Sequence, residues 1–171
     1  MSLIDSTYFK QDLSVVINEF SDSADYITKY EHKILNQILG YELAKLVSAY
    51  DTETSDQRII DLVEGVEFSL TYNGSERLVK WSGFKSSDDN LIANYVWYWY
   101  QRSRLVMDSG IGAVKPNSEN ASRGDLSMKA MAAWDNIVNQ FEILYLFLDA
   151  NKTIYPEWYC DPVTRINSLD L

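Results

Sequence analysis

Residues 86–108, SSDDNLIANYVWYWYQRSRLVMD, decide the fold. Serine and acidic residues open the segment, as is favoured at the N-terminus of a helix. The aromatic run from Tyr95 to Tyr100 spreads rings around most of the circumference of such a helix rather than along one face. The segment therefore predicts a long helix, ending near Asp108, that is packed on several sides. Its main apolar stripe consists of Ile92, Tyr95, Val96, Trp99 and Val106.

Helical spacing recurs on both sides of this segment. Apolar residues at steps of three and four from Ala24 onward predict a helix that breaks at Gly40-Tyr41 and resumes as far as Tyr50. A short helix is expected from about residue 56 to 64, and a long one from about 125 to 149. The buried stripe expected on the last helix is Trp134, Ile137, Val138, Phe141, Tyr145 and Leu148.

Between these helices the spacing changes to the alternation that is typical of strands. Phe68, Leu70 and Tyr72 alternate with polar residues up to Asn73-Gly74, after which residues 77–81 continue the pattern. Asn and Gly tolerate the positive φ that a two-residue type I′ turn requires at both positions. The sequence therefore predicts a β-hairpin at about 66–82. Because an isolated hairpin is only marginally stable, it must lie on the helices or against another subunit.

Three stretches lack a regular pattern. Residues 1–22 and 150–171 are predicted to be terminal arms, and residues 108–124, rich in Gly, Asn and Ser, a long loop. The chain of 171 residues fits one domain, whose helical part spans 23–149. The predicted fold is mainly α: a helical bundle with one β-hairpin insertion and extended N- and C-terminal arms.

The composition excludes several classes of protein. Fifteen Lys and Arg against 25 Asp and Glu give a net charge of −10, which disfavours sequence-specific DNA binding because that needs clustered cations. One cysteine and one histidine cannot supply an internal disulfide or a Cys/His zinc site. No signal peptide opens the chain, and no uncharged run approaches the ~20 residues that span a bilayer. We therefore expect a soluble intracellular protein without a membrane partner.

No motif assigns a catalytic, cofactor-binding or metal site. His32 lies within a predicted helix, away from any nucleophile turn, and Cys160 has no neighbouring cation that would lower its pKa. We expect a structural histidine and an inert thiol. Residues 109–115 lack the Gly-Lys-Ser/Thr ending of a phosphate loop, and residues 51–56 begin no EF-hand. A catalytic carboxylate pair stays open, because 25 acidic residues offer many pairs.

The aromatic run from Tyr95 to Tyr100 admits two interpretations. A stacking platform for single-stranded nucleic acid needs a basic groove beside the rings, and only Arg102 and Arg104 are close in sequence. Tyr and Trp are also enriched where one protein surface buries another. With 13% aromatic residues, more than one core needs, the sequence favours a helix that contributes to both the core and a subunit interface.

The order of several short segments along the chain is similar to that of a known class of proteins. These segments are Leu3-Ile4-Asp5-Ser6-Thr7-Tyr8-Phe9, Tyr30-Glu31, Leu39-Gly40-Tyr41, Lys80-Trp81-Ser82-Gly83, residues 91–100, Ser109-Gly110-Ile111-Gly112 to Glu119-Asn120-Ala121, and Tyr155-Pro156-Glu157-Trp158. Across nearly the whole chain, this pattern resembles structural proteins of tailed phages and prophages. Its size and helix layout are similar to those of the head-to-tail connector, or adaptor, family, whose small helical proteins form a ring beneath the portal.

The resemblance implies a non-enzymatic virion protein made in the host cytoplasm. Its subunits would form a homo-oligomeric ring, a dodecamer, that contacts the portal protein and tail or stopper proteins. DNA would pass without specific binding, and an acidic wall would keep the genome from adhering. The candidate interface residues are Tyr72, Asn73, Gly74, Trp81, Trp97, Tyr98, Tyr100, Gly110, Ile111, Gly112, Tyr155, Trp158 and Tyr159.

Two alternatives from other classes remain open. A small phage acid/base hydrolase would hold a carboxylate of raised pKa in a concave pocket. A monomeric protein-binding module would use the aromatic helix and Trp81 as a groove for a partner helix.

Overall fold

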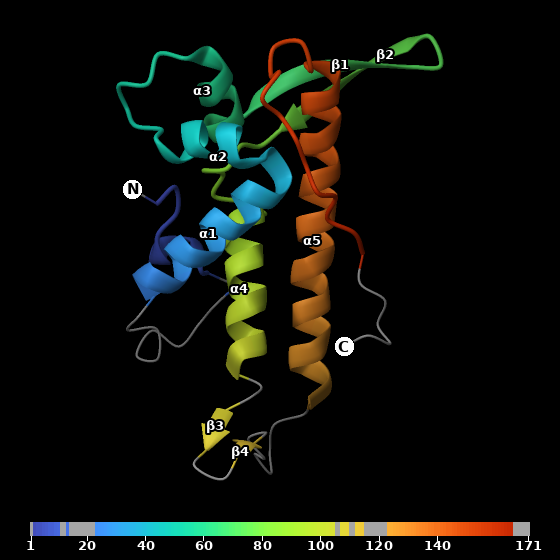
Figure 1. The fold of residues 1–171 in the computed structure, drawn as a ribbon. Helices are drawn as coiled ribbons and strands as arrows, with labels where there is room; N and C mark the ends of the chain where they lie inside the picture. The colour runs from blue at the N-terminus through green and yellow to red at the C-terminus, as the bar shows by residue number, and fades with distance from the viewer. Residues whose placement is uncertain are drawn as a thin grey trace.

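The computed structural model describes residues 2–10, 13, 23–104, 107–109, 112–114 and 123–165. Helices α4 and α5 stand side by side, α1 runs obliquely across α4, and a hairpin projects beyond the end of α5 (Figure 1). The prediction of a mainly α fold with a β-hairpin is confirmed. The elements are η1 (Ser6–Tyr8), α1 (Ser23–Leu39), α2 (Tyr41–Ser48), α3 (Gln57–Glu64), β1 (Val66–Tyr72), β2 (Ser75–Trp81), α4 (Leu91–Arg104), β3 (Met107–Ser109), β4 (Gly112–Val114) and α5 (Arg123–Ala150).

Helix α4 forms the centre of the bundle. It packs on α1 along one side and on α5 along another, and every residue from 91 to 98 is buried. The prediction that the aromatic helix is packed on several sides is therefore confirmed. The expected break between α1 and α2 is also present at Gly40, whose φ of 76° a residue with a side chain rarely adopts.

The predicted start of α4 at Ser86 is wrong by several residues. Asp89 has a φ of 47°, which a right-handed helix cannot contain, and Asn90 is the actual N-cap. Its Oδ1 accepts a hydrogen bond of 2.9 Å from the Ala93 amide, while its Nδ2 donates to the Phe84 carbonyl at 2.6 Å. Ser86 instead closes a short turn by donating to the Asp88 carbonyl. The helix also ends at Arg104 rather than near residue 108.

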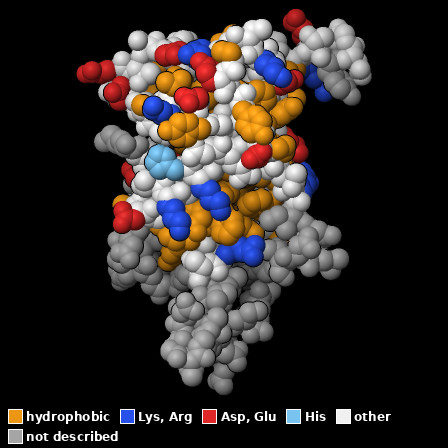
Figure 2. All heavy atoms as spheres, viewed as in Figure 1, with side chains coloured by type: hydrophobic (Ala, Val, Ile, Leu, Met, Phe, Trp, Pro, Cys, Tyr) orange, Lys and Arg blue, Asp and Glu red, His pale blue; other side chains and the backbone are white. Residues whose placement is uncertain are grey.

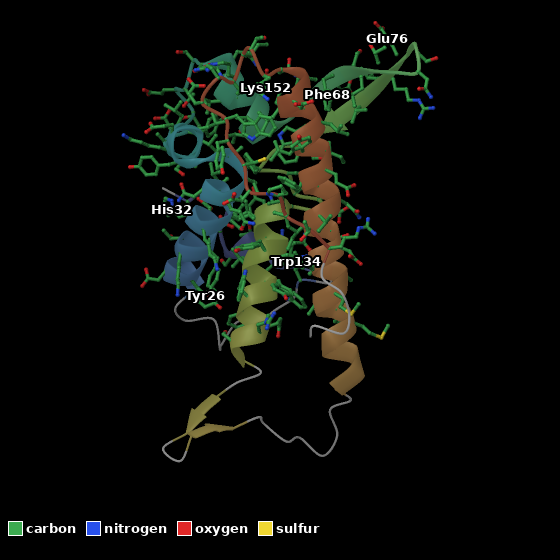
Figure 3. The ribbon with its side chains drawn as sticks, turned by 45° about the vertical axis from the view of Figure 1, so that its right-hand side comes forward. Tyr26, His32, Phe68, Glu76, Trp134 and Lys152 are labelled. Carbon is green, nitrogen blue, oxygen red and sulfur yellow. The ribbon has the colours of Figure 1, made fainter. Side chains whose placement is uncertain are left out.

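The predicted hairpin is present, with the expected turn. Strands β1 and β2 pair antiparallel from Val66↔Trp81 to Tyr72↔Ser75, and both turn residues, Asn73 and Gly74, have positive φ. The base of the hairpin packs on α5, where the rings of Phe68 and Phe147 lie 5.3 Å apart. Figure 3 shows Phe68 at this base and Glu76 at the far end. The hairpin therefore lies on the helices only at its base.

The predicted irregular loop at 108–124 contains regular structure. Strands β3 and β4 form a second, short antiparallel ladder that pairs Met107 with Val114 and Ser109 with Gly112. The sequence offered no signal for it, because three-residue strands are too short for an alternating pattern to be recognised. Gly110 and Ile111, two of the candidate interface residues, lie outside the described residues, and Gly112 begins β4.

The described part of the N-terminal arm is bound to its own subunit by a buried carboxylate. Glu31 of α1 is 1% exposed, and Leu3 and Ile4 are buried beside it. The Glu31 carboxylate accepts hydrogen bonds from the Ser2 hydroxyl at 2.5 Å and from the amides of Leu3 and Ile4 at 3.0 and 3.4 Å. Residues 2–10, within the predicted N-terminal arm, therefore lie on their own subunit.

Glu31→Gln is expected to lower the free energy of unfolding by about 2 kcal/mol, because charge-assisted hydrogen bonds are lost. The amide NH2 of glutamine would also face N–H donors that it cannot accept from. Glu42→Gln, an exposed change on α2, serves as the control and should shift stability by less than ~0.5 kcal/mol. Urea denaturation of the two variants measures the difference, and equal stabilities would contradict the assigned role of Glu31.

The C-terminal strap, residues 151–165, also lies on its own subunit. It satisfies the last carbonyl groups of α1: the Trp158 Nε1 donates to Ile38 at 3.1 Å, and the amides of Tyr159 and Asp161 donate to Leu39 and Gln37 at 3.3 and 2.8 Å. These carbonyls have no partner within the helix, so the strap acts as its C-cap. The sequence predicted an arm at these positions, and its described residues lie on their own subunit.

Candidate assembly interface

Most of the aromatic residues predicted to form an interface belong to the core. Trp81, Trp97, Tyr98 and Tyr155 are 1–2% exposed, and Tyr100 is 8% exposed. Trp81 donates from Nε1 to the Leu62 carbonyl at 3.0 Å and packs on Phe84, which leaves no groove at this position for a partner helix. The assignment of these five residues to a surface is corrected, because the subunit itself provides the neighbours that cover them.

Two surfaces that the sequence predicted remain accessible. At the hairpin tip, Asn73, Gly74 and residues 75–78 are exposed, with Leu78 at 68%. The side chain of Tyr72 is outside the described set. On the strap, Tyr159 is 70% exposed, and half-buried Trp158 packs edge to face with Tyr145 of α5 at 5.4 Å. Tyr145 is itself 40% exposed, so its predicted place in the buried stripe of α5 is wrong.

A third surface, which we call the aromatic–cationic face, was missed. Its rings form a continuous series across α1, α4 and α5: Tyr26, Tyr30, Trp99, Tyr98 and Trp134, with neighbouring centroids 4.6–5.9 Å apart. The ring of Tyr98 is buried and joins Trp99 to Trp134 beneath this surface. Three cations cover this series. The Lys29 and Lys33 ammonium groups lie 5.3 and 4.4 Å from the ring centres of Tyr30 and Trp99, and the Arg102 guanidinium lies 5.7 Å from Trp99.

Figure 2 shows three blue side chains grouped over orange ones on the lower half of this view. Only Arg102 and Arg104 are close to the aromatic run in sequence, whereas two of these three cations come from α1, far away in the chain. The spacing of Tyr26, Lys29, Tyr30 and Lys33 at i, i+3, i+4 and i+7 is the signal that could have placed them on one side of a helix.

Burial and hydrogen bonding set the chemistry of this face. Desolvation raises the pKa of Tyr26 to about 12. The Arg102 guanidinium donates to the Tyr98 hydroxyl at 2.9 Å, which fixes the cation above the rings. The buried Nε1 of Trp99 has no hydrogen-bond acceptor within the described ranges. The exposed cations of this face can therefore attract negatively charged groups.

The structure holds a polar cavity of about 610 Å³ beside the start of α4, lined by residues of the N-terminal segment, residues 87–90, α4 and α5. The two carboxylates that line it, Asp88 and Asp89, are exposed to solvent. His32 is exposed as well, as expected for a solvated side chain, and is the pale blue group in Figure 2. Burial, then Asp161, raises the pKa of the Cys160 thiol, which keeps it protonated.

Among the described residues, no cluster of three or more His, Cys, Asp or Glu side chains is arranged to hold a metal ion. None of the helices in the described ranges is both long and apolar enough to span a bilayer. No family model, no curated protein and no solved structure matches the chain.

Proposed function

We propose that the protein is a structural head-to-tail connector subunit of a tailed phage, which assembles into a ring between portal and tail. The hairpin carries this proposal. Residues 75–78 are exposed, and the packing of the hairpin on α5 involves its base, through Phe68. Because a two-stranded ribbon alone is only marginally stable, its outer half needs a surface that another molecule supplies. A ring subunit meets such a surface on its neighbour or on the portal.

Two further properties support the proposal. The chain has its own core, with both described terminal segments fixed to the subunit, so it can fold before it assembles. Its net charge of −10 suits a wall past which DNA moves without binding. The proposal assigns the protein to the virion after synthesis in the host cytoplasm. It gives the protein three contacts: its own neighbours, the portal protein, and tail or stopper proteins.

The mass of the full chain, measured by light scattering over a concentration series, tests this function directly. The series is run with the protein alone and with a candidate portal, and large species are imaged by negative stain. Rings, or a complex formed only with the portal assembly, are the expected result. A protein that stays monomeric and does not bind the portal at any concentration would contradict the proposal and favour a monomeric binding module.

Leu78→Ser is expected to abolish assembly while leaving the subunit folded. Leu78 is 68% exposed, so its loss should change the free energy of unfolding by less than ~0.5 kcal/mol. If the Leu78 side chain is buried in an interface, its replacement by serine should weaken association by about 1–3 kcal/mol, the free energy gained by burying a leucine side chain. The matched control is Leu46→Ser, a 42% exposed apolar residue of α2. Melting temperature and light-scattering mass separate the two effects, and equal loss of both in Leu78→Ser would refute the hairpin contact.

A further inference from the structure

The cations of the aromatic–cationic face have no carboxylate partner among the residues that the structure describes. Within the ranges that the structure describes, the ion pairs are made by Arg58 and Lys85. Lys29, Lys33 and Arg102 are exposed and contact rings instead. In a chain with ten more acidic than basic side chains, three exposed cations gathered on one surface are an attractive site for a negatively charged partner.

The opposite charge lies on a different side of the same subunit. Asp135, Glu142 and Asp149 of α5 are all exposed, and their seven-residue spacing places them on one side of the helix, about 10.5 Å apart along its axis. Exposed Met128 and Leu146 share that side, which we call the acidic stripe. One cation adjoins it: Arg165 of the strap donates to Asn139 at 3.1 Å.

The two surfaces do not overlap. The aromatic–cationic face reaches α5 only at Trp134. The ring of Trp134 lies 4.7 Å from that of Tyr98 of α4, and Figure 3 shows Trp134 between the two helices. Asp135 of the acidic stripe, the next residue along α5, points about 100° away from Trp134, because each residue of a helix advances by that angle. A contact between them cannot form within one subunit. It can form between copies, and such a heterologous contact generates a ring when its rotation closes.

We propose that the aromatic–cationic face of one copy docks against the acidic stripe of α5 in the next copy. This inference rests on the proposed ring, and it names the two surfaces that close it. Tyr30 and Trp99 would supply the half-buried aromatic anchors typical of strong contacts, and Met128 and Leu146 the apolar surface opposite. The charges would set the order and direction of the copies. A nucleic acid is the less favoured occupant, because the chain as a whole repels polyanions.

Charge reversal on each surface tests the pairing in the full chain. The first variant is Lys29→Glu with Lys33→Glu, and the second is Glu142→Lys with Asp149→Lys. Each alone should weaken self-association at least tenfold by light scattering, since like charges then face each other. In the first variant both surfaces are negative, and in the second both are positive. An equimolar mixture of the two should therefore recover the wild-type mass, because copies of opposite charge can alternate around the ring. Rising salt should weaken wild-type assembly.

A matched control separates specific pairing from net charge. Lys45→Glu with Lys152→Glu changes the charge by the same amount at two exposed positions elsewhere and should assemble normally. If both reversed variants assemble as wild type does, the pairing is overturned while the ring proposal stands. If wild type itself never assembles, the proposed function fails. A fluorescent single-stranded oligonucleotide that binds wild type but not Lys29→Glu with Lys33→Glu would make nucleic acid the occupant and also overturn the pairing.

Discussion

Gly83→Ala is expected to cost more than ~4 kcal/mol of stability, enough to unfold most of the protein. Gly83 has a φ of 88° and follows β2 where the chain crosses the end of α3. A Cβ added here would lie 2.5 Å from the Glu64 carbonyl carbon and from the Gly65 nitrogen. These are backbone atoms, held by hydrogen bonds from the Phe84 and Lys85 amides to the carbonyls of Leu62 and Val63 at 3.1 and 2.9 Å. The clash therefore cannot relax without separating the hairpin from α3.

Gly74→Ala provides the control for backbone strain alone. Gly74 has a similar φ of 76°, but a Cβ at this position would meet no atom within 4 Å. Its replacement should cost only the conformational penalty of about 1 kcal/mol. Urea denaturation of both variants measures the difference. Similar losses in Gly83→Ala and Gly74→Ala would mean that the crossing with α3 can open at little cost, which contradicts the close packing seen here.

This crossing marks a limit of what the sequence could predict. The hairpin and its turn were predictable, because alternation and an Asn-Gly pair are local signals. The helix break at Gly40 was predictable for the same reason. That Gly83 must lack a side chain was not, because the requirement comes from a segment nearly twenty residues earlier. The start of α4 was misjudged where two local signals competed: Ser86 has the chemistry of an N-cap, but Asn90 occupies that position.

The candidate interface shows a second limit. The rings around α4 correctly predicted packing on several sides, but the sequence does not say whether the subunit or a partner supplies the packing. Trp97 and Tyr98 were assigned to a partner and are covered by the subunit itself. Conversely, the sequence did not predict that Lys29 and Lys33 of α1 lie over the rings of Tyr30 and Trp99 at the surface. Both errors have one cause: contacts between helices depend on their packing geometry, which residue spacing within one helix does not determine.

Tyr155→Ala is expected to be the second most damaging substitution, because it removes the anchor of the C-terminal strap. Tyr155 is 2% exposed, its ring lies 5.6 Å from that of Phe147, and its hydroxyl donates to the Arg58 carbonyl at 3.0 Å. Burial raises the pKa of this hydroxyl, as expected for a ring enclosed by the core. The cavity and the lost hydrogen bond should together cost about 3–5 kcal/mol.

The loss should spread along the strap. The Arg58 guanidinium donates to the Ile154 carbonyl at 3.0 Å and pairs with Glu157 at 3.3 Å, so both contacts depend on Tyr155 staying in place. Beyond them, the strap caps the end of α1. Tyr155→Ala should therefore raise the rate of amide hydrogen exchange in residues 36–40 as well as lower the melting temperature.

Tyr159→Ala is the matched control, four residues along the same strap. Tyr159 is 70% exposed, and its backbone amide donates to the Leu39 carbonyl at 3.3 Å. Its substitution should change the free energy of unfolding by less than ~0.5 kcal/mol. If Tyr159 contacts a neighbour or the portal, this variant should reduce the assembled mass while its melting temperature is kept. Equal destabilisation by the two substitutions would show that the strap is held by its backbone rather than by the buried ring of Tyr155.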